Sequence, residues 1–170
     1  MFKNSDQHTT SHETIRLNGK LKDITTIKDQ QGNIIHKVMS PLMIEIYPRD
    51  IFQIITGATI LAIPIGFTQE VWILADKLPW LNILGLIVLS LFFMGSFIHH
   101  NFYQEHLERH HTAFIKRIII IYLFSFLIVA VMLHLIGQTP WSTDWILALK
   151  KVLIVTFPAS LSAAVTDMIK

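Results

Sequence analysis

The stretch Gly57-Ala-Thr-Ile-Leu-Ala-Ile-Pro-Ile-Gly-Phe-Thr-Gln-Glu-Val-Trp72 decides the fold of this chain. It belongs to an apolar segment over residues 51–71, which is long enough to cross a hydrocarbon core about 30 Å thick at roughly 1.5 Å per residue. A proline inside a spanning helix and an acid at its end are both unfavourable unless protein or water compensates for them. The stretch therefore predicts a membrane-spanning helix in which Pro64 and Glu70 need such compensation.

The composition of the whole chain is that of an integral membrane protein. Hydrophobic residues make up 52% of the sequence and charged residues only 15%, and the mean hydropathy is +0.49. The net charge of +2 is small, and the basic residues form no stripe with interleaved aromatics, so we expect no nucleic-acid partner. Because the chain has no cysteine, disulfides, thiolate metal sites and cysteine nucleophiles are excluded.

Four apolar segments predict an all-α membrane protein with four transmembrane helices. They cover about residues 51–71, 80–99, 118–137 and 145–167, and each has the length of a membrane span. Trp72 and Trp80 bracket the short turn after the first segment, a position that suits the membrane interface. Residues 49–170 are therefore expected to form one transmembrane domain in contact with lipid.

The residues before this domain are polar and divide into two parts. Residues 1–14 contain almost no apolar side chain and predict a disordered tail. Within residues 15–48, two segments rich in β-branched residues flank Gln30-Gln-Gly-Asn33. This pattern predicts a small cytoplasmic β-hairpin with Gly32 at a position of positive φ.

The distribution of lysine and arginine predicts the orientation in the membrane. With the amino terminus inside, eleven of the 14 Lys and Arg residues lie on the cytoplasmic side. Lys77 lies in an outer loop, and Lys150 and Lys151 lie within the fourth segment. The positive-inside rule therefore favours both termini in the cytoplasm. For Lys150 and Lys151 we expect an interfacial start of the fourth helix from Ser142, and side chains that reach outward are the alternative.

The first and fourth predicted helices each carry a proline, a face of small or hydroxyl-bearing residues and a terminal acid. The positions that share these faces at helical spacing are Thr56, Thr59, Gly66 and Glu70 in the first helix and Thr156, Ser160 and Asp167 in the fourth. An acid at the carboxyl end of a helix is unfavourable because the macrodipole is negative there. One interpretation is that these residues line a path for a cation or proton.

A second interpretation of these faces, that they serve only to pack helices together, is equally compatible with the sequence. Small residues allow helices to pack closely, and the acids would then be merely interfacial, with Glu70 paired to Lys150 or Lys151. The sequence pattern alone does not decide between a path and a packing surface.

A histidine-rich segment follows the second predicted span. His99, His106 and His110 fall on one face if this helix continues beyond the membrane. Three such histidines would suit a divalent transition metal or a pH sensor, because imidazole changes its charge between pH 5 and 8. A solvated helix next to the membrane is the alternative that we favour. The chain carries no Walker loop, nucleophile elbow or dinucleotide-binding glycine pattern, so we expect neither an enzyme nor a cofactor.

Three strings carry a resemblance to a known family: Phe67-Thr-Gln-Glu-Val-Trp72, Arg117 ahead of the third span, and Thr156-Phe-Pro-Ala-Ser160 followed by Asp167. In these strings the chain resembles a family of bacterial integral membrane proteins of unknown function. Gln69 stands where the family has a glutamate, which argues against a pair of carboxylates and leaves Glu70 alone. The resemblance covers about residues 50–170 and implies a polytopic protein of the bacterial inner membrane, but no activity.

Taken together, these patterns favour a homo-oligomeric channel or transporter for a cation or proton. Four helices cannot easily enclose a watery path alone, so the first and fourth helices would line one at a subunit interface. The histidine segment would act as a pH-dependent gate. The alternative is a non-transporting membrane scaffold or accessory protein that docks a partner through the same small faces.

Overall fold

The computed structural model describes residues 9–17, 20–29, 33–41, 46–103 and 107–169. The chain divides into two compact units, residues 1–45 and residues 46–170, and each is described here by itself.

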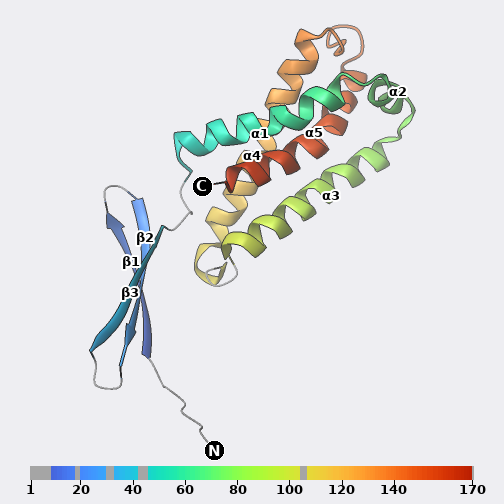
Figure 1. Cartoon of the computed structure of the whole chain (residues 1–170). Helices are drawn as coiled ribbons and strands as arrows, with labels where there is room; N and C mark the ends of the chain where they lie inside the picture. Colours follow the sequence, from blue (N-terminus) through green and yellow to red (C-terminus); the bar gives the residue numbers. More distant parts are fainter. Residues whose placement is uncertain (1–8, 18–19, 30–32, 42–45, 104–106, 170) are drawn as a thin grey trace, which may run out of the picture. The chain divides into compact units, whose positions relative to one another are not determined.

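The first unit contains a three-stranded antiparallel sheet in the order β1-β2-β3, formed by Thr9–Leu17, Lys20–Lys28 and Ile34–Pro41 (Figure 1). The predicted hairpin is confirmed as β2 and β3, which pair with Ile24 opposite Met39. The predicted tail is wrong for residues 9–14, because these belong to β1 and pair along β2. Its threonines are polar but β-branched, and β2 offers them a free edge. Gly32 lies outside the described residues.

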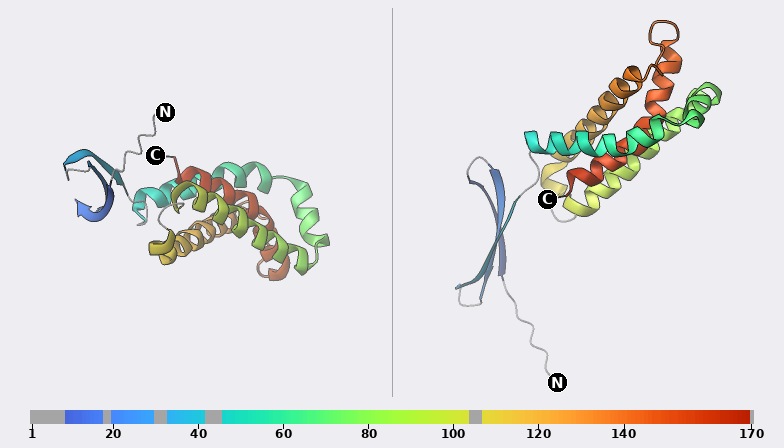
Figure 2. Two further views of the ribbon diagram at one scale, coloured as in Figure 1. Left: turned by 90° about the horizontal axis from the view of Figure 1, so that it is seen from below. Right: turned by 45° about the horizontal axis from the view of Figure 1, so that its top comes forward.

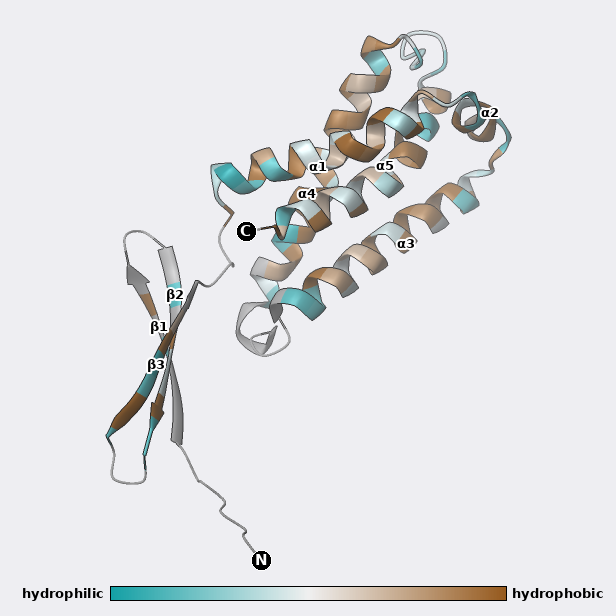
Figure 3. Ribbon diagram, viewed as in Figure 1, coloured by the Kyte–Doolittle hydropathy of each residue, from teal (hydrophilic) through white to brown (hydrophobic). Residues whose placement is uncertain are grey.

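The second unit is helical and contains four helices long and apolar enough to span a membrane (Figure 3). In chain order its elements are α1 Pro48–Gly66, α2 Gln69–Lys77, α3 Trp80–Ile98, the π-helical turn η1 His99–Tyr103, α4 Leu107–Leu135 and α5 Trp145–Asp167. The predicted class, with four transmembrane helices and a small amino-terminal β-hairpin, is therefore confirmed, and β1 adds a third strand to the hairpin.

The first span ends earlier than predicted, at Gly66 rather than residue 71. Side chains satisfy the carbonyl groups at this helix end, as every helix terminus requires. The Thr68 hydroxyl donates to the Ile65 carbonyl at 2.7 Å, and the Trp72 indole N–H donates to the Gly66 carbonyl at 3.0 Å. The chain then begins the separate short helix α2.

Helix α5 is the centre of the bundle, in contact with α1, α3 and α4 (Figures 1 and 2). Half of its span is buried inside the protein, compared with 22–33% of the other three spans. Small residues allow α1 to approach it closely: Gly57, Ala58 and Ala62 are all buried. A Cβ atom at Gly57 would lie 2.8 Å from the Cα atom of Ala163. Close contact between small residues is a common basis of helix association in membranes.

We predict that Gly57→Ala destabilises the bundle by about 1–3 kcal/mol, because the added methyl group meets backbone atoms of α5 and forces the two helices apart. Chemical unfolding in detergent micelles measures this loss. Gly85→Ala in α3 is the matched control, since a Cβ there has no neighbour within 4 Å. Equal stability of the Gly57→Ala variant and the wild type would show that α1 and α5 tolerate separation.

Candidate functional site

The first component of the site is a buried ion pair between α4 and α5. Arg117 lies near the start of the α4 span, and Asp167 is the last residue of α5. The Arg117 Nε–H donates to Asp167 Oδ2 at 2.8 Å, and Nη2 lies 2.7 Å from the same oxygen. Both side chains are only 1% exposed. The pair therefore joins the beginning of one span to the end of another.

Asp50 of α1 completes this cluster. Its Oδ2 atom lies 3.9 Å from Arg117 Nη2 and also accepts the backbone N–H of Tyr47 at 3.1 Å. The carboxylate stands in the first turn of α1, where the positive end of the macrodipole stabilises it. We call Asp50, Arg117 and Asp167 the charge cluster; it links the ends of three membrane spans.

The charge cluster places one guanidinium against two carboxylates away from water. Burying an unpaired charge costs several kcal/mol, so each member depends on the others. Asp167 needs its partner most, because it stands at the carboxyl end of α5, where the macrodipole is unfavourable. Asp167 is completely buried and ion-paired inside the protein, although it is the last residue of its span.

Two buried hydroxyl groups continue this polar character along α5. Ser160 Oγ lies 2.7 Å from Ser90 Oγ of α3, and the Thr156 hydroxyl donates to the Val152 carbonyl at 2.7 Å. All three side chains are completely buried. Because Thr156, Ser160 and Asp167 are spaced by four and seven residues, they share one face of the helix. We call this face, with Ser90 and the charge cluster, the polar line.

The predicted face of α1 does not join the polar line. Thr56 is exposed and Thr59 is half-buried, and each hydroxyl donates to the carbonyl four residues earlier, at 2.9 and 2.7 Å. Gly66 is buried beside the Met132 side chain. Since α1 turns its glycine and alanine residues toward α5, its threonines point elsewhere. The structure brings together the α5 residues of the predicted path and leaves the α1 threonines apart from them.

Glu70 occupies a different environment from the one predicted. It is exposed in the first turn of α2, where the macrodipole stabilises a carboxylate. The prediction that it ends the first span is wrong, because α1 stops at Gly66 and α2 is a new helix. The argument from an unfavourable helix end therefore applies to Asp167 and not to Glu70.

The two lysines of α5 lie at the end of the bundle opposite the charge cluster. Lys150 Nζ donates to the Leu78 carbonyl at 2.8 Å, and Lys151 Nζ donates to the Gln138 carbonyl at 3.1 Å. An interfacial helix start from Ser142 is not found, because α5 begins at Trp145 with Asp144 as its N-cap. Both lysine side chains instead bond carbonyl groups of the loops, and Lys151 is buried.

The predicted histidine face is not formed by one continuous helix. His99 belongs to η1, whereas His110 belongs to α4, and His106 lies outside the described residues. The His99 ring packs edge-on against Phe114 of α4, with the centroids 6.3 Å apart. Within the part of the chain that the structure describes, no group of three His, Cys, Asp or Glu side chains is placed to hold a metal.

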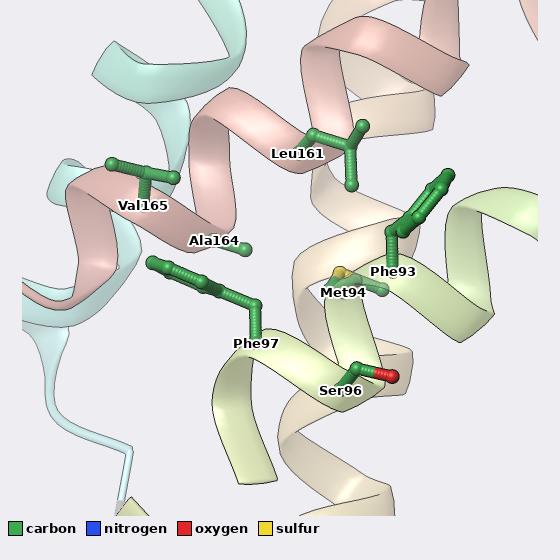
Figure 4. Close-up of a pocket in the computed structure, with 7 residues that line it drawn as sticks. All are labelled: Phe93, Met94, Ser96, Phe97, Leu161, Ala164 and Val165. Atoms are coloured by element: carbon green, nitrogen blue, oxygen red, sulfur yellow. The ribbon is translucent and has the colours of Figure 1, made fainter. Parts of the chain in front are cut away.

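An apolar groove of about 420 Å³ lies between α3 and α5. Figure 4 shows Phe93 and Phe97 of α3 on one side and Leu161 and Val165 of α5 on the other. Ser96 is the polar residue of its lining. The groove therefore offers hydrophobic contact but no ionisable group, unlike the polar line.

Sequence reasoning missed Asp50 and Arg117 as site residues. In the sequence, Arg117 stands out only as the residue ahead of the third span, and Asp50 lies just before the first span without a predicted role. Their signal was nevertheless present, because each charge directly adjoins an apolar run, and ionisable residues within spans usually have a function. What the sequence did not show is that three such residues from separate spans meet.

Comparison with known families agrees with this architecture. A family model described as "Putative integral membrane protein (DUF2391)" matches residues 15–169, which include the end of β1, strands β2 and β3 and all four described spans. Searches of curated proteins and of solved structures found no match.

We predict that Arg117→Met lowers the free energy of unfolding by about 3–5 kcal/mol, because it leaves Asp167 buried without its guanidinium. Adding Asp167→Asn should restore part of that loss, since the remaining group is neutral. Unfolding in a single detergent measures both variants, and Lys116→Met, a change at the exposed neighbour, is the control. Strictly additive losses in the double variant would contradict the coupling of the two residues.

Proposed function

The chain belongs to the DUF2391 family of integral membrane proteins, and from that premise we propose that it moves protons or small cations across the membrane. The observation that carries this proposal is the polar line in the core of the bundle. Burying ionisable groups in a membrane helix is costly, and where they occur they usually mark a path for ions or protons. The charge cluster would be the loading point and the α5 hydroxyls the continuation of the path.

The packing of the core favours a proton within a single subunit. Val129, Val152 and Val155 are completely buried around the α5 hydroxyls, so a hydrated ion has no room there. A proton needs only hydroxyl groups, carboxylates and bridging water. Ser160 and Asp167 are seven residues apart, or roughly 10 Å along the helix axis. A proton relay between them would therefore require at least one bridging water.

A small cation would instead need a wider path between subunits. The face of α1 that carries Thr56 and Thr59 is directed away from α5 and is available for such a contact. This helix has the lowest hydropathy of the four spans, although only 33% of it is buried. Covering a less apolar helix by a second copy would remove its hydroxyl groups from lipid. This supports a homo-oligomer with a channel or transporter path along α1.

The proposed setting is a bacterial inner membrane with both termini in the cytoplasm. The positive-inside rule supports this orientation and places the charge cluster at the cytoplasmic end of the bundle. His99 lies at the same end and would be the pH-sensing element of the proposed gate. No catalytic role is part of the proposal, since the sequence offers no enzyme motif.

A non-transporting scaffold or accessory protein is the second candidate. The observation in its favour is the close pairing of Arg117 with Asp167, which can lock a bundle together without conducting anything. The small faces of α1 and α5 pack against each other, so a partner would have to dock elsewhere. Transport measurements separate the two candidates.

We expect purified protein in liposomes to dissipate an imposed proton gradient. Ser90→Ala combined with Ser160→Ala should abolish this flux, because the variant removes the hydroxyl pair while leaving the charge cluster in place. Ser162→Ala is the matched control, since this half-buried hydroxyl of α5 is outside the polar line. Flux is followed with an internal pH dye and compared with K⁺, Na⁺ and Cl⁻ gradients. A folded wild-type protein that dissipates none of them would reject transport and favour the scaffold.

A further inference from the structure

A second groove, of about 680 Å³, lies between α3 and α4, on the other side of α3 from the apolar groove. Its walls are apolar, with Leu91 and Phe92 from α3 and Phe114 and Ile118 from α4. The volume falls within the roughly 300–1,000 Å³ range of small-molecule sites. Since these helices are membrane spans, the molecule that meets this surface is a lipid rather than a soluble ligand.

Gly95 gives the groove its depth. The nearest side-chain atom to a Cβ placed there is Cδ1 of Ile118, at 3.5 Å. The helix therefore presents no side chain at the point where α4 faces it. Gly95 thus lines the groove without filling it, with Ile118 of α4 opposite.

Polar side chains lie at one end of the groove. His99 and His100 line it, and they follow directly after the last residue of α3. They belong to the π-helical turn η1, a rare geometry that is frequent at functional sites. The edge-on contact with Phe114, at an interplanar angle of 82°, orients the His99 ring. Imidazole N–H groups are donors for phosphate oxygens.

The order of these features along the groove matches a phospholipid. The apolar walls lie within the span and the histidines lie at its end, as acyl chain and headgroup do in a bilayer. Lys116 of α4 is exposed near the same end and carries a positive charge, and the exposed His111 adds a further imidazole. We propose that this groove is a binding site for an anionic glycerophospholipid, with its phosphate at His99 and His100 and one acyl chain between α3 and α4.

The proposal does not depend on transport. The groove between α3 and α5 has walls of similar character, and Ser96 lines both grooves, but only the groove between α3 and α4 also has His99 and His100 in its lining. Chemistry that would recognise a headgroup is therefore found on the α4 side of α3.

Native mass spectrometry of the full chain in detergent tests the site with dioleoyl phosphatidylglycerol and dioleoyl phosphatidylcholine as probes. We expect phosphatidylglycerol to bind more tightly. His99→Ala combined with His100→Ala should weaken its binding about tenfold, as expected for lost hydrogen bonds to a charged group. Gly95→Leu should weaken the binding of both lipids, because the leucine side chain would occupy part of the groove.

Two matched controls should leave binding unchanged. His134→Ala removes an exposed histidine at the other end of α4, and Gly85→Leu adds the same side chain to an open surface of α3. Equal affinity for the two lipids, or unchanged binding in the histidine and Gly95→Leu variants, would overturn the proposal. Displacement of phosphatidylglycerol by millimolar inorganic phosphate, with no effect of Gly95→Leu, would also overturn it and indicate a free-phosphate site.

Discussion

Arg117 is the residue on which the arrangement of the bundle depends, because its charge is stable at that depth only between two carboxylates. One carboxylate comes from the start of α1 and the other from the end of α5. Each has its own local reason: Asp50 caps α1, whereas Asp167 stands at an unfavourable helix end and relies on the guanidinium. The requirement to satisfy one buried cation thus fixes which ends of three membrane spans meet.

Along the rest of the bundle, contacts of a different kind take over. Hydrophobicity does not drive helices together in lipid, so close packing and hydrogen bonds must do so. The glycine and alanine residues of α1 supply the packing against α5, and the Ser90–Ser160 contact joins α3 to the same helix. At the far end, Lys150 and Lys151 bond the carbonyl groups of two loops. Helix α5 takes part in all of these contacts, which explains why it is the most buried span.

The sequence predicted what depends on length and periodicity. Four spans, the β2–β3 hairpin and the shared face of Thr156, Ser160 and Asp167 all follow from local patterns, and the structure contains them. The predictions that were wrong concern features that depend on contacts between neighbouring elements. Helix α1 has two faces that could pack against a neighbour, one with the threonines and one with the glycine and alanine residues. Which of them packs against α5 depends on the shape of α5. The early end of α1, strand β1 and the pairing of Asp50 with Arg117 depend in the same way on contacts that a single segment does not reveal.

The least constrained span is α3, and this bears on both proposals. Its one hydrogen bond to α5 between described side chains is the Ser90–Ser160 pair, Met94 and Ile98 pack in the apolar core, and its carboxyl-terminal half has a groove on each side. By contrast, α1 is held by close backbone contact and α4 by an ion pair. Any rearrangement that lets water reach Ser160 would therefore meet least resistance if α3 moves. A lipid between α3 and α4 would rest against this helix on the side away from α5. A bound lipid would thus favour the position of α3 in which Ser90 meets Ser160. The lipid composition of the membrane would then influence the polar line, although the lipid does not contact its residues.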